Sequence, residues 1–161
     1  MTRWWWGTAP APNSPCGAGR HLLADDEVGS RPKFRPTRVV SIAGPLDAVY
    51  AAHNGDDRIV TAIGGTPSEV PERYKMVDPV QNIAADTPVV ALHGSKDTVV
   101  SPENSRRYVN AARLAGGDAK LVLVDGEDHV SIVSGDSPNY SKVIDTITSV
   151  ADAELDKVVS P

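Results

Sequence analysis

The stretch that most limits the possible folds of this chain is an apolar run that ends in a polar loop, Thr87-Pro88-Val89-Val90-Ala91-Leu92-His93-Gly94-Ser95-Lys96-Asp97. Its aliphatic part has no polar alternation, which is typical of a strand covered on both faces, as in a parallel sheet. Gly94 and Ser95 end the strand, and Asp97 follows in the loop. We therefore expect a buried strand that leads directly to a carboxylate at a candidate site.

A second unit of the same kind lies further along the chain. An apolar strand is predicted over residues 120–124, and the loop Asp125-Gly126-Glu127-Asp128-His129 follows it. Between the two strands a helix is predicted over residues 102–115, with Ser101 as its N-cap and Gly116-Gly117 as its stop. Together these elements form a strand–helix–strand crossover.

The topology of such a crossover predicts where the polar side chains lie. It is almost always right-handed and joins parallel strands, so the loops that leave both strands emerge at one edge of the sheet. Open α/β sheets place their chemistry at this carboxyl edge. Asp97 and His129 are therefore expected to be neighbours, and a carboxylate that orients a histidine supplies two of the three members of a nucleophilic triad.

The rest of the chain supplies the other layers. A strand is predicted over residues 39–43 and a helix over 45–53, and an irregular excursion over 63–80 either borders a pocket or is only a solvent-exposed connection. We divide the chain into a poorly ordered leader and loop, residues 1–36, and a domain, residues 37–161. One apolar face marks a closing helix, formed by Val143, Ile144, Ile147, Val150, Ala151, Leu155 and Val158.

Composition narrows the classes of function. The 161 residues are 40% apolar and 23% charged, which suits one globular domain. A net charge of −5 argues against nucleic acid or an anionic membrane as the main partner. The single cysteine, Cys16, excludes an intrachain disulfide, and no apolar run is long enough to span a bilayer. We expect a cytoplasmic protein.

The sequence resembles the α/β-hydrolases, and within them the esterase and prolyl-oligopeptidase-like branch. The resemblance rests on the 88–97 segment, the 102–115 helix with its double glycine, and the 126–129 loop, and it extends roughly over residues 39–150. It implies a partial three-layer α/β fold with a short, mostly parallel sheet flanked by helices. It also implies a serine hydrolase that acts on small-molecule esters or peptides without a cofactor, with Asp97 as the triad acid and His129 as the base.

The third member of such a triad is missing from the sequence. The family carries its nucleophile in G-x-S-x-G on a sharp strand-to-helix turn, and this chain has no such motif. The segment most similar to this motif, around Ser14, has Pro12 and Cys16 in the glycine positions and no buried strand before it. An HGGG-type oxyanion segment is also absent, so the nucleophile stays unassigned. We interpret four further serines as structural: Ser41, Ser95, Ser131 and Ser134.

The absence of a nucleophile motif leaves several interpretations of the chain open. The 39–43 strand would lie at an open edge and expose unpaired backbone and apolar faces. Either another chain supplies the missing half, or the chain is the C-terminal part of a longer, truncated hydrolase, which we favour. A non-catalytic remnant or interaction module could instead use this edge for self-association, together with Trp4-Trp5-Trp6, which could equally belong to a non-native leader.

A metal site is a further alternative at the predicted sheet edge. Histidine and carboxylate side chains suit zinc or manganese. Their spacing in the sequence is not compact, however, and His93 is expected to be a packing or hydrogen-bonding residue at the end of its strand. We therefore expect no metal at the four residues concerned, His93, Asp97, Asp128 and His129.

Overall fold

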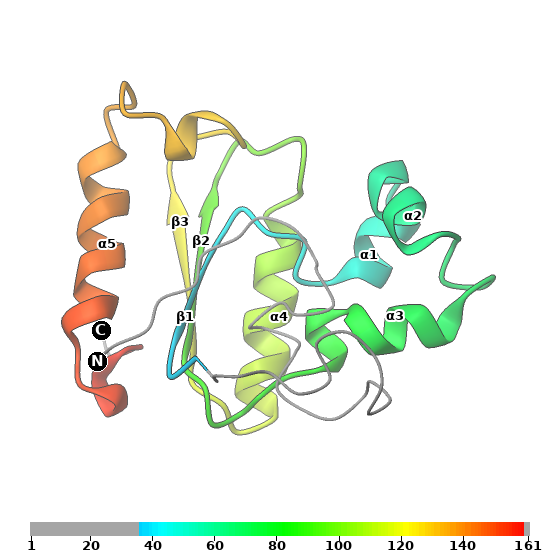
Figure 1. Cartoon of the computed structure of the whole chain (residues 1–161). Coiled ribbons are helices and arrows are strands. Elements are labelled where there is room, and N and C mark those ends of the chain that lie inside the picture. Colours follow the sequence, from blue (N-terminus) through cyan, green and yellow to red (C-terminus); the bar gives the residue numbers. More distant parts are fainter. Residues whose placement is uncertain (1–35, 160–161) are drawn as a thin grey trace.

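The structure is a computed structural model that describes residues 36–159. The predictions for residues 1–35, including Ser14, Cys16 and Trp4-Trp5-Trp6, lie outside the described residues. The described part is an α/β fold with a sheet between layers of helices (Figure 1). In chain order its elements are β1 (Val39–Ile42), α1 (Ala48–His53), α2 (Asp57–Ile63), α3 (Pro71–Val77), η1 (Pro79–Gln81), β2 (Val89–Gly94), α4 (Glu103–Leu114), β3 (Ala119–Val124), η2 (Ser131–Val133), α5 (Tyr140–Asp152) and η3 (Leu155–Lys157).

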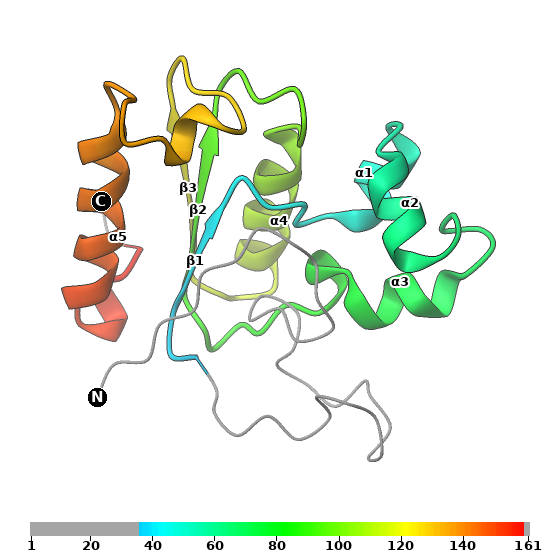
Figure 2. The ribbon, with the colours of Figure 1, turned by 45° about the horizontal axis from the view of Figure 1, so that its top comes forward.

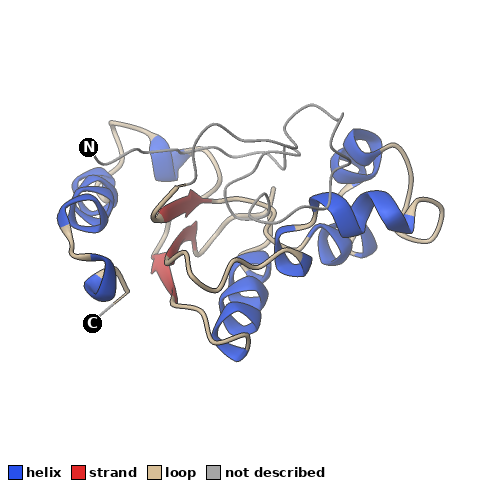
Figure 3. Ribbon diagram, turned by 60° about the horizontal axis from the view of Figure 1, so that its bottom comes forward, coloured by secondary structure: helices blue, strands red, loops and turns tan. Residues whose placement is uncertain are grey.

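The sheet has the predicted parallel strands, in the order β1-β2-β3. Val89 of the central strand pairs with Val39 on one side and with Ala119 on the other. Helix α5 lies on one face of the sheet and α4 on the other, so the expected three-layer arrangement is confirmed (Figures 1 and 3). The loops that leave β2 and β3 both lie at the top edge in Figure 1.

The alternation of side chains along β1 and β2 divides the core into two halves. Successive side chains of a strand point to opposite faces, so an apolar strand supplies both layers. One half packs against α5 and contains Val40, Ile42, Val90 and Leu92. The other packs against α4 and contains Val39, Val89, Ala91, Tyr108 and Ala112. All residues of β2 are buried, which explains its continuous apolar sequence.

Short helices occupy much of the segment between β1 and β2, so the irregular excursion predicted over residues 63–80 is confined to residues 64–70. Helices α1, α2 and α3 gather beyond α4, away from α5 (Figure 2). They share a small core of their own around Ala48, Ala51, Ile59 and Tyr74. The buried carboxylate of Asp78 accepts hydrogen bonds from the first N–H groups of α1, at 2.8 Å from Ala48 and 3.4 Å from Val49. Helix caps and a small core of this kind depend on contacts between separate segments. Long apolar periodicity in the sequence therefore does not reveal them.

Three helix boundaries differ from the predicted ones for local reasons. Helix α1 begins after Asp47, whose side chain accepts the Tyr50 N–H at 2.8 Å. Helix α4 begins at Glu103, one residue late, although the Ser101 hydroxyl still accepts the Glu103 N–H at 3.3 Å. Helix α5 ends at Asp152, and Val158 reaches the core from beyond η3 rather than from the same helix.

Strand β1 lies at an edge of the sheet, as predicted, but its apolar faces are covered. Within residues 36–159 it pairs with β2 only. Its apolar side chains, Val39, Val40 and Ile42, are nevertheless only 3%, 5% and 8% exposed. The prediction that this strand exposes apolar faces is therefore wrong.

Candidate active site

The loop after β2 holds Asp97 through its own backbone. Oδ1 of Asp97 accepts the N–H groups of Val99 and Val100, both at 2.8 Å. An aspartate that accepts from the backbone two and three residues further on forms a compact turn with no help from other elements. The side chain is fully buried. The turn therefore fixes one oxygen of the carboxylate and leaves Oδ2 to other partners.

The loop after β3 holds His129 in a similar local turn. The carboxylate of Asp128 accepts the N–H groups of Val130 at 2.9 Å and Ser131 at 2.8 Å, and the Ser131 hydroxyl accepts the Asp128 N–H at 2.8 Å. This reciprocal pattern resembles a capping box and opens η2. The bonds from Ser131 and Val130 lower the pKa of Asp128. His129 stands inside this turn, so its backbone is fixed on both sides.

The structure brings Asp97 and His129 together. Nδ1 of His129 lies 2.8 Å from Oδ2 of Asp97, across two loops that leave neighbouring strands. A carboxylate only accepts hydrogen bonds, so Nδ1–H donates and a neutral ring carries its lone pair on Nε2. The His129 side chain is 26% exposed, and Nε2 has no hydrogen-bond partner among residues 36–159. A histidine in this geometry can receive a proton at Nε2, and an adjacent carboxylate can stabilise the resulting positive charge.

The close approach of the two loops depends on Gly94. A Cβ atom at this position would lie 2.3 Å from the carbonyl oxygen of Glu127 and 2.7 Å from its carbonyl carbon. The same carbonyl oxygen accepts the Lys96 N–H at 2.9 Å, which ties the loop of His129 to the loop of Asp97. The sequence identified Gly94 only as the end of a strand, because close backbone approach is a tertiary contact.

Glu127 is a further residue of the site that the sequence did not single out. It is 3% exposed, and its carboxylate accepts hydrogen bonds from the Ser137 hydroxyl and from Nδ2 of Asn139, the latter at 2.7 Å. Hydrogen bonds from Ser131, Ser137 and Asn139 lower its pKa. The carboxylate thereby fastens the loop of His129 to the start of α5. In the sequence Glu127 is one of several acidic loop residues, and nothing there sets it apart.

His93 lies behind Asp97 at the end of β2, fully buried. Its Nδ1 is 2.7 Å from the Ser105 hydroxyl and its Nε2 is 2.9 Å from the carbonyl oxygen of Val100. The same Nε2 is 3.3 Å from Oδ2 of Asp97. Burial lowers the pKa of His93. Its hydrogen-bonding role agrees with the prediction, but the contact with Asp97 was not foreseen.

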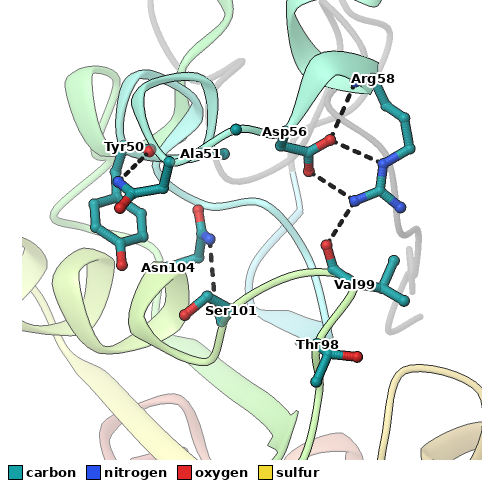
Figure 4. A pocket seen from close by; sticks show the side chains of 10 residues that line it. Tyr50, Ala51, Asp56, Arg58, Thr98, Val99, Ser101 and Asn104 are labelled. Carbon is teal, nitrogen blue, oxygen red and sulfur yellow. Dashed lines mark hydrogen bonds and ion pairs between the residues drawn. The ribbon is translucent and has the colours of Figure 1, made fainter.

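A polar pocket of about 200 Å³ lies beside the loop of Asp97 (Figure 4). One wall comes from α1 and the start of α2 and the other from residues 98–104, and the 63–80 segment does not line this pocket. Arg58 joins the walls, because it donates to the Val99 carbonyl at 2.6 Å and is paired with Asp56 at 2.8 Å. The lining residues are Tyr50, Ala51, Asn54, Gly55, Asp56, Arg58, Thr98, Val99, Ser101 and Asn104.

The remaining predicted residues have structural partners. The Ser95 hydroxyl donates to Asp125 at 3.0 Å and accepts the Gly126 N–H at 2.9 Å, and the Ser134 hydroxyl accepts the Asp136 N–H at 3.3 Å. Ser41 is buried in β1. Within residues 36–159 no serine hydroxyl is hydrogen-bonded to His129, and no group of three or more His, Cys, Asp or Glu side chains could hold a metal ion.

No helix in the described part of the chain is long and apolar enough to cross a membrane.

Comparison with known proteins gives one family. Residues 39–152 match the model of the prolyl oligopeptidase family. The isoprenylcysteine alpha-carbonyl methylesterase of Arabidopsis thaliana is 32% identical over 84 residues, which cover 50% of this chain and 20% of the methylesterase.

Two solved structures share the fold. A thermophilic esterase of Thermogutta terrifontis is 22% identical with a TM-score of 0.57, and the match covers 87% of this chain and 49% of the esterase. The acylaminoacyl peptidase of Pyrococcus horikoshii is 14% identical with a TM-score of 0.67, and the match covers 96% of this chain and 26% of the peptidase. The chain therefore spans half or less of the length of each of these relatives.

Proposed function

Because this chain belongs to the prolyl oligopeptidase family of α/β-hydrolases, we propose that Asp97 and His129 are the acid and the base of a serine-hydrolase site. The observation that carries the proposal is the 2.8 Å contact between Oδ2 of Asp97 and Nδ1 of His129 at the carboxyl ends of two parallel strands. This contact leaves Nε2 of a partly exposed histidine ready to accept a proton.

In the proposed reaction His129 first acts as a general base. Nε2 takes the proton from a serine hydroxyl while the serine oxygen attacks the carbonyl carbon of an ester or peptide, and Asp97 stabilises the imidazolium. The same proton then passes from Nε2 to the leaving oxygen or nitrogen, and water completes hydrolysis of the acyl-enzyme. No cofactor takes part in this scheme.

We propose that this chain supplies the acid and base half of the site and that the serine comes from outside residues 36–159. Two observations support this: no described serine is hydrogen-bonded to His129, and the chain spans half or less of the length of the relatives reported above. The polar pocket beside the loop of Asp97 would then receive part of the substrate. We expect a small ester or peptide to bind there.

Hydrolysis of 4-nitrophenyl acetate by the purified chain tests the proposal. The variants are Asp97→Asn, which keeps the shape of the acid, and His129→Ala, with exposed Asp145→Asn and His53→Ala as matched controls. Loss of the acid or the base is expected to lower kcat/KM by about 10²- to 10⁴-fold. A fluorophosphonate reagent, which labels activated serines, followed by peptide mapping would identify the nucleophile. A measurable wild-type rate that neither site substitution lowers would refute the proposal, whereas a rate no higher than that of uncatalysed hydrolysis would place the serine outside this chain.

A second candidate function is a protein-interaction module. The supporting observation is that β1 pairs on one side only within the described residues, so its outer edge can accept a further strand. Self-association through this edge predicts a concentration-dependent increase in mass in analytical ultracentrifugation. A monomer over the whole concentration range would remove this candidate.

A further inference from the structure

The carboxylate of Asp97 is held by backbone at one oxygen and lies close to two imidazole rings at the other. Oδ1 accepts the N–H groups of Val99 and Val100. Oδ2 lies 2.8 Å from Nδ1 of His129 and 3.3 Å from Nε2 of His93. One ring is 26% exposed and the other is fully buried. The buried ring is thus the rigid neighbour of the oxygen that His129 uses.

The hydrogen bonds of His93 fix its tautomer. The carbonyl oxygen of Val100, 2.9 Å from Nε2, can only accept, so Nε2 carries a proton. Burial lowers the pKa of His93 and keeps the ring neutral. Nδ1 therefore has a lone pair and accepts the hydroxyl proton of Ser105 at 2.7 Å. The single N–H of the ring donates to the Val100 carbonyl, and Oδ2 of Asp97 lies 3.3 Å from the same nitrogen.

Ser105 connects this ring to a rigid helix. It lies in the first turn of α4 and is fully buried, as is His93 at the end of β2. The series of polar contacts Ser105–His93–Asp97–His129 therefore runs from α4, through the central strand, to the partly exposed histidine. Each member touches the next, and only His129 reaches solvent to a substantial extent.

We propose that His93, oriented by Ser105, is a positioning residue that holds Oδ2 of Asp97 against Nδ1 of His129. The final torsion of a carboxylate is broad and has no sharp preferred angle, so its orientation depends on the donors around it. Without His93, Oδ2 keeps a single close nitrogen neighbour, Nδ1 of His129, whose ring is itself partly exposed. The contact between Asp97 and His129 would then be populated less completely. The importance of this contact for hydrolysis rests on the proposed function, but its geometry does not.

The test is the NMR signal of the Nδ1–H proton of His129 in the intact chain, which needs neither a substrate nor a nucleophile. His93→Phe fills the space without a donor, whereas His93→Gln restores one donor and one acceptor. Ser105→Ala removes the group that orients the ring. Val90→Ala is the matched control, because it also perturbs the buried part of β2 but does not enter the series of polar contacts. Far-UV circular dichroism establishes that each variant is folded.

We expect the signal to disappear or broaden in His93→Phe and Ser105→Ala and to persist in His93→Gln and Val90→Ala. Where hydrolysis is measurable, kcat of His93→Phe should fall by about 10- to 100-fold with KM unchanged. An unchanged signal in folded His93→Phe, or failure of folded His93→Gln to restore it, would overturn the proposal. If His93→Phe does not fold, an unchanged signal in folded Ser105→Ala would overturn it. Hydrolysis that persists in His129→Ala, together with the expected NMR pattern, would count against the proposed function alone.

Discussion

Replacing Gly94 by alanine should separate the two loops of the candidate site. The added Cβ would lie 2.3 Å from the Glu127 carbonyl oxygen and 3.1 Å from that of Asp128. Because ordinary contacts of carbon with other heavy atoms lie near 3.5 Å, the backbone around Glu127 must retreat by roughly 1 Å. The same movement lengthens the bond from the Lys96 N–H and carries His129 away from Asp97.

The expected cost of Gly94→Ala is about 1–3 kcal/mol in the free energy of unfolding, the usual range for overpacking, measured by urea denaturation. The Nδ1–H signal of His129 should weaken in parallel, because a 1 Å displacement breaks a 2.8 Å hydrogen bond. Gly135→Ala is the matched control, since its Cβ would meet no heavy atom within 4 Å and its backbone needs no positive φ. A Gly94→Ala variant with the stability of Gly135→Ala and an intact signal would refute this reasoning.

Three further predictions concern buried polar groups. Burial raises the pKa of Asp78, so its contribution to stability is present at low pH and is lost as the pH rises through the folded-state pKa; Asp78→Asn should flatten that fall in urea denaturation at several pH values. Hydrogen bonds from Ser131, Ser137 and Asn139 lower the pKa of Glu127, so the opposite sign holds: stability is lost as the pH falls, and Glu127→Gln should reduce this loss in the same assay. Tyr74→Phe removes the 3.0 Å bond to the Gly65 carbonyl and should lower the free energy of unfolding by about 1 kcal/mol in thermal denaturation, and no change would show that the bond is unimportant.

The sheet and the contact between Asp97 and His129 could be predicted because they depend on information that is local or topological. The apolar run of β2 identifies a central strand, and parallel crossover topology places the loops after β2 and β3 at one edge. The fold of residues 45–80 could be predicted only for its first helix, α1, which lies within the expected 45–53 helix. Its short helices start at caps such as Asp47 and Asp78, and their core uses few large apolar residues, so their periodicity is weak.

The supporting residues of the site were missed because their roles exist only after folding. Gly94 matters through a carbonyl group that is far away in the sequence, and Glu127 through partners at the start of α5. His93 was expected to make hydrogen bonds, but its proximity to Oδ2 of Asp97 depends on how the loop turns back over the end of β2. Patterns in a single sequence indicate which face of a helix or strand is buried and where that helix or strand ends. The contacts of these three residues depend instead on how separate helices, strands and loops are placed relative to one another.

The separate core of α1, α2 and α3 allows the pocket and the paired loops to change independently. One pocket wall, including Tyr50 and Asn54, stands on this small core, while Asp97 and His129 stand on the strands of the sheet. Arg58 is the main polar bridge between the wall and the loop of Asp97. Substitutions on the helical wall can therefore change the shape of the pocket while the contact between Asp97 and His129 keeps its geometry. The helical wall is therefore free to vary in sequence, whereas the two paired loops are constrained by the strands that hold them.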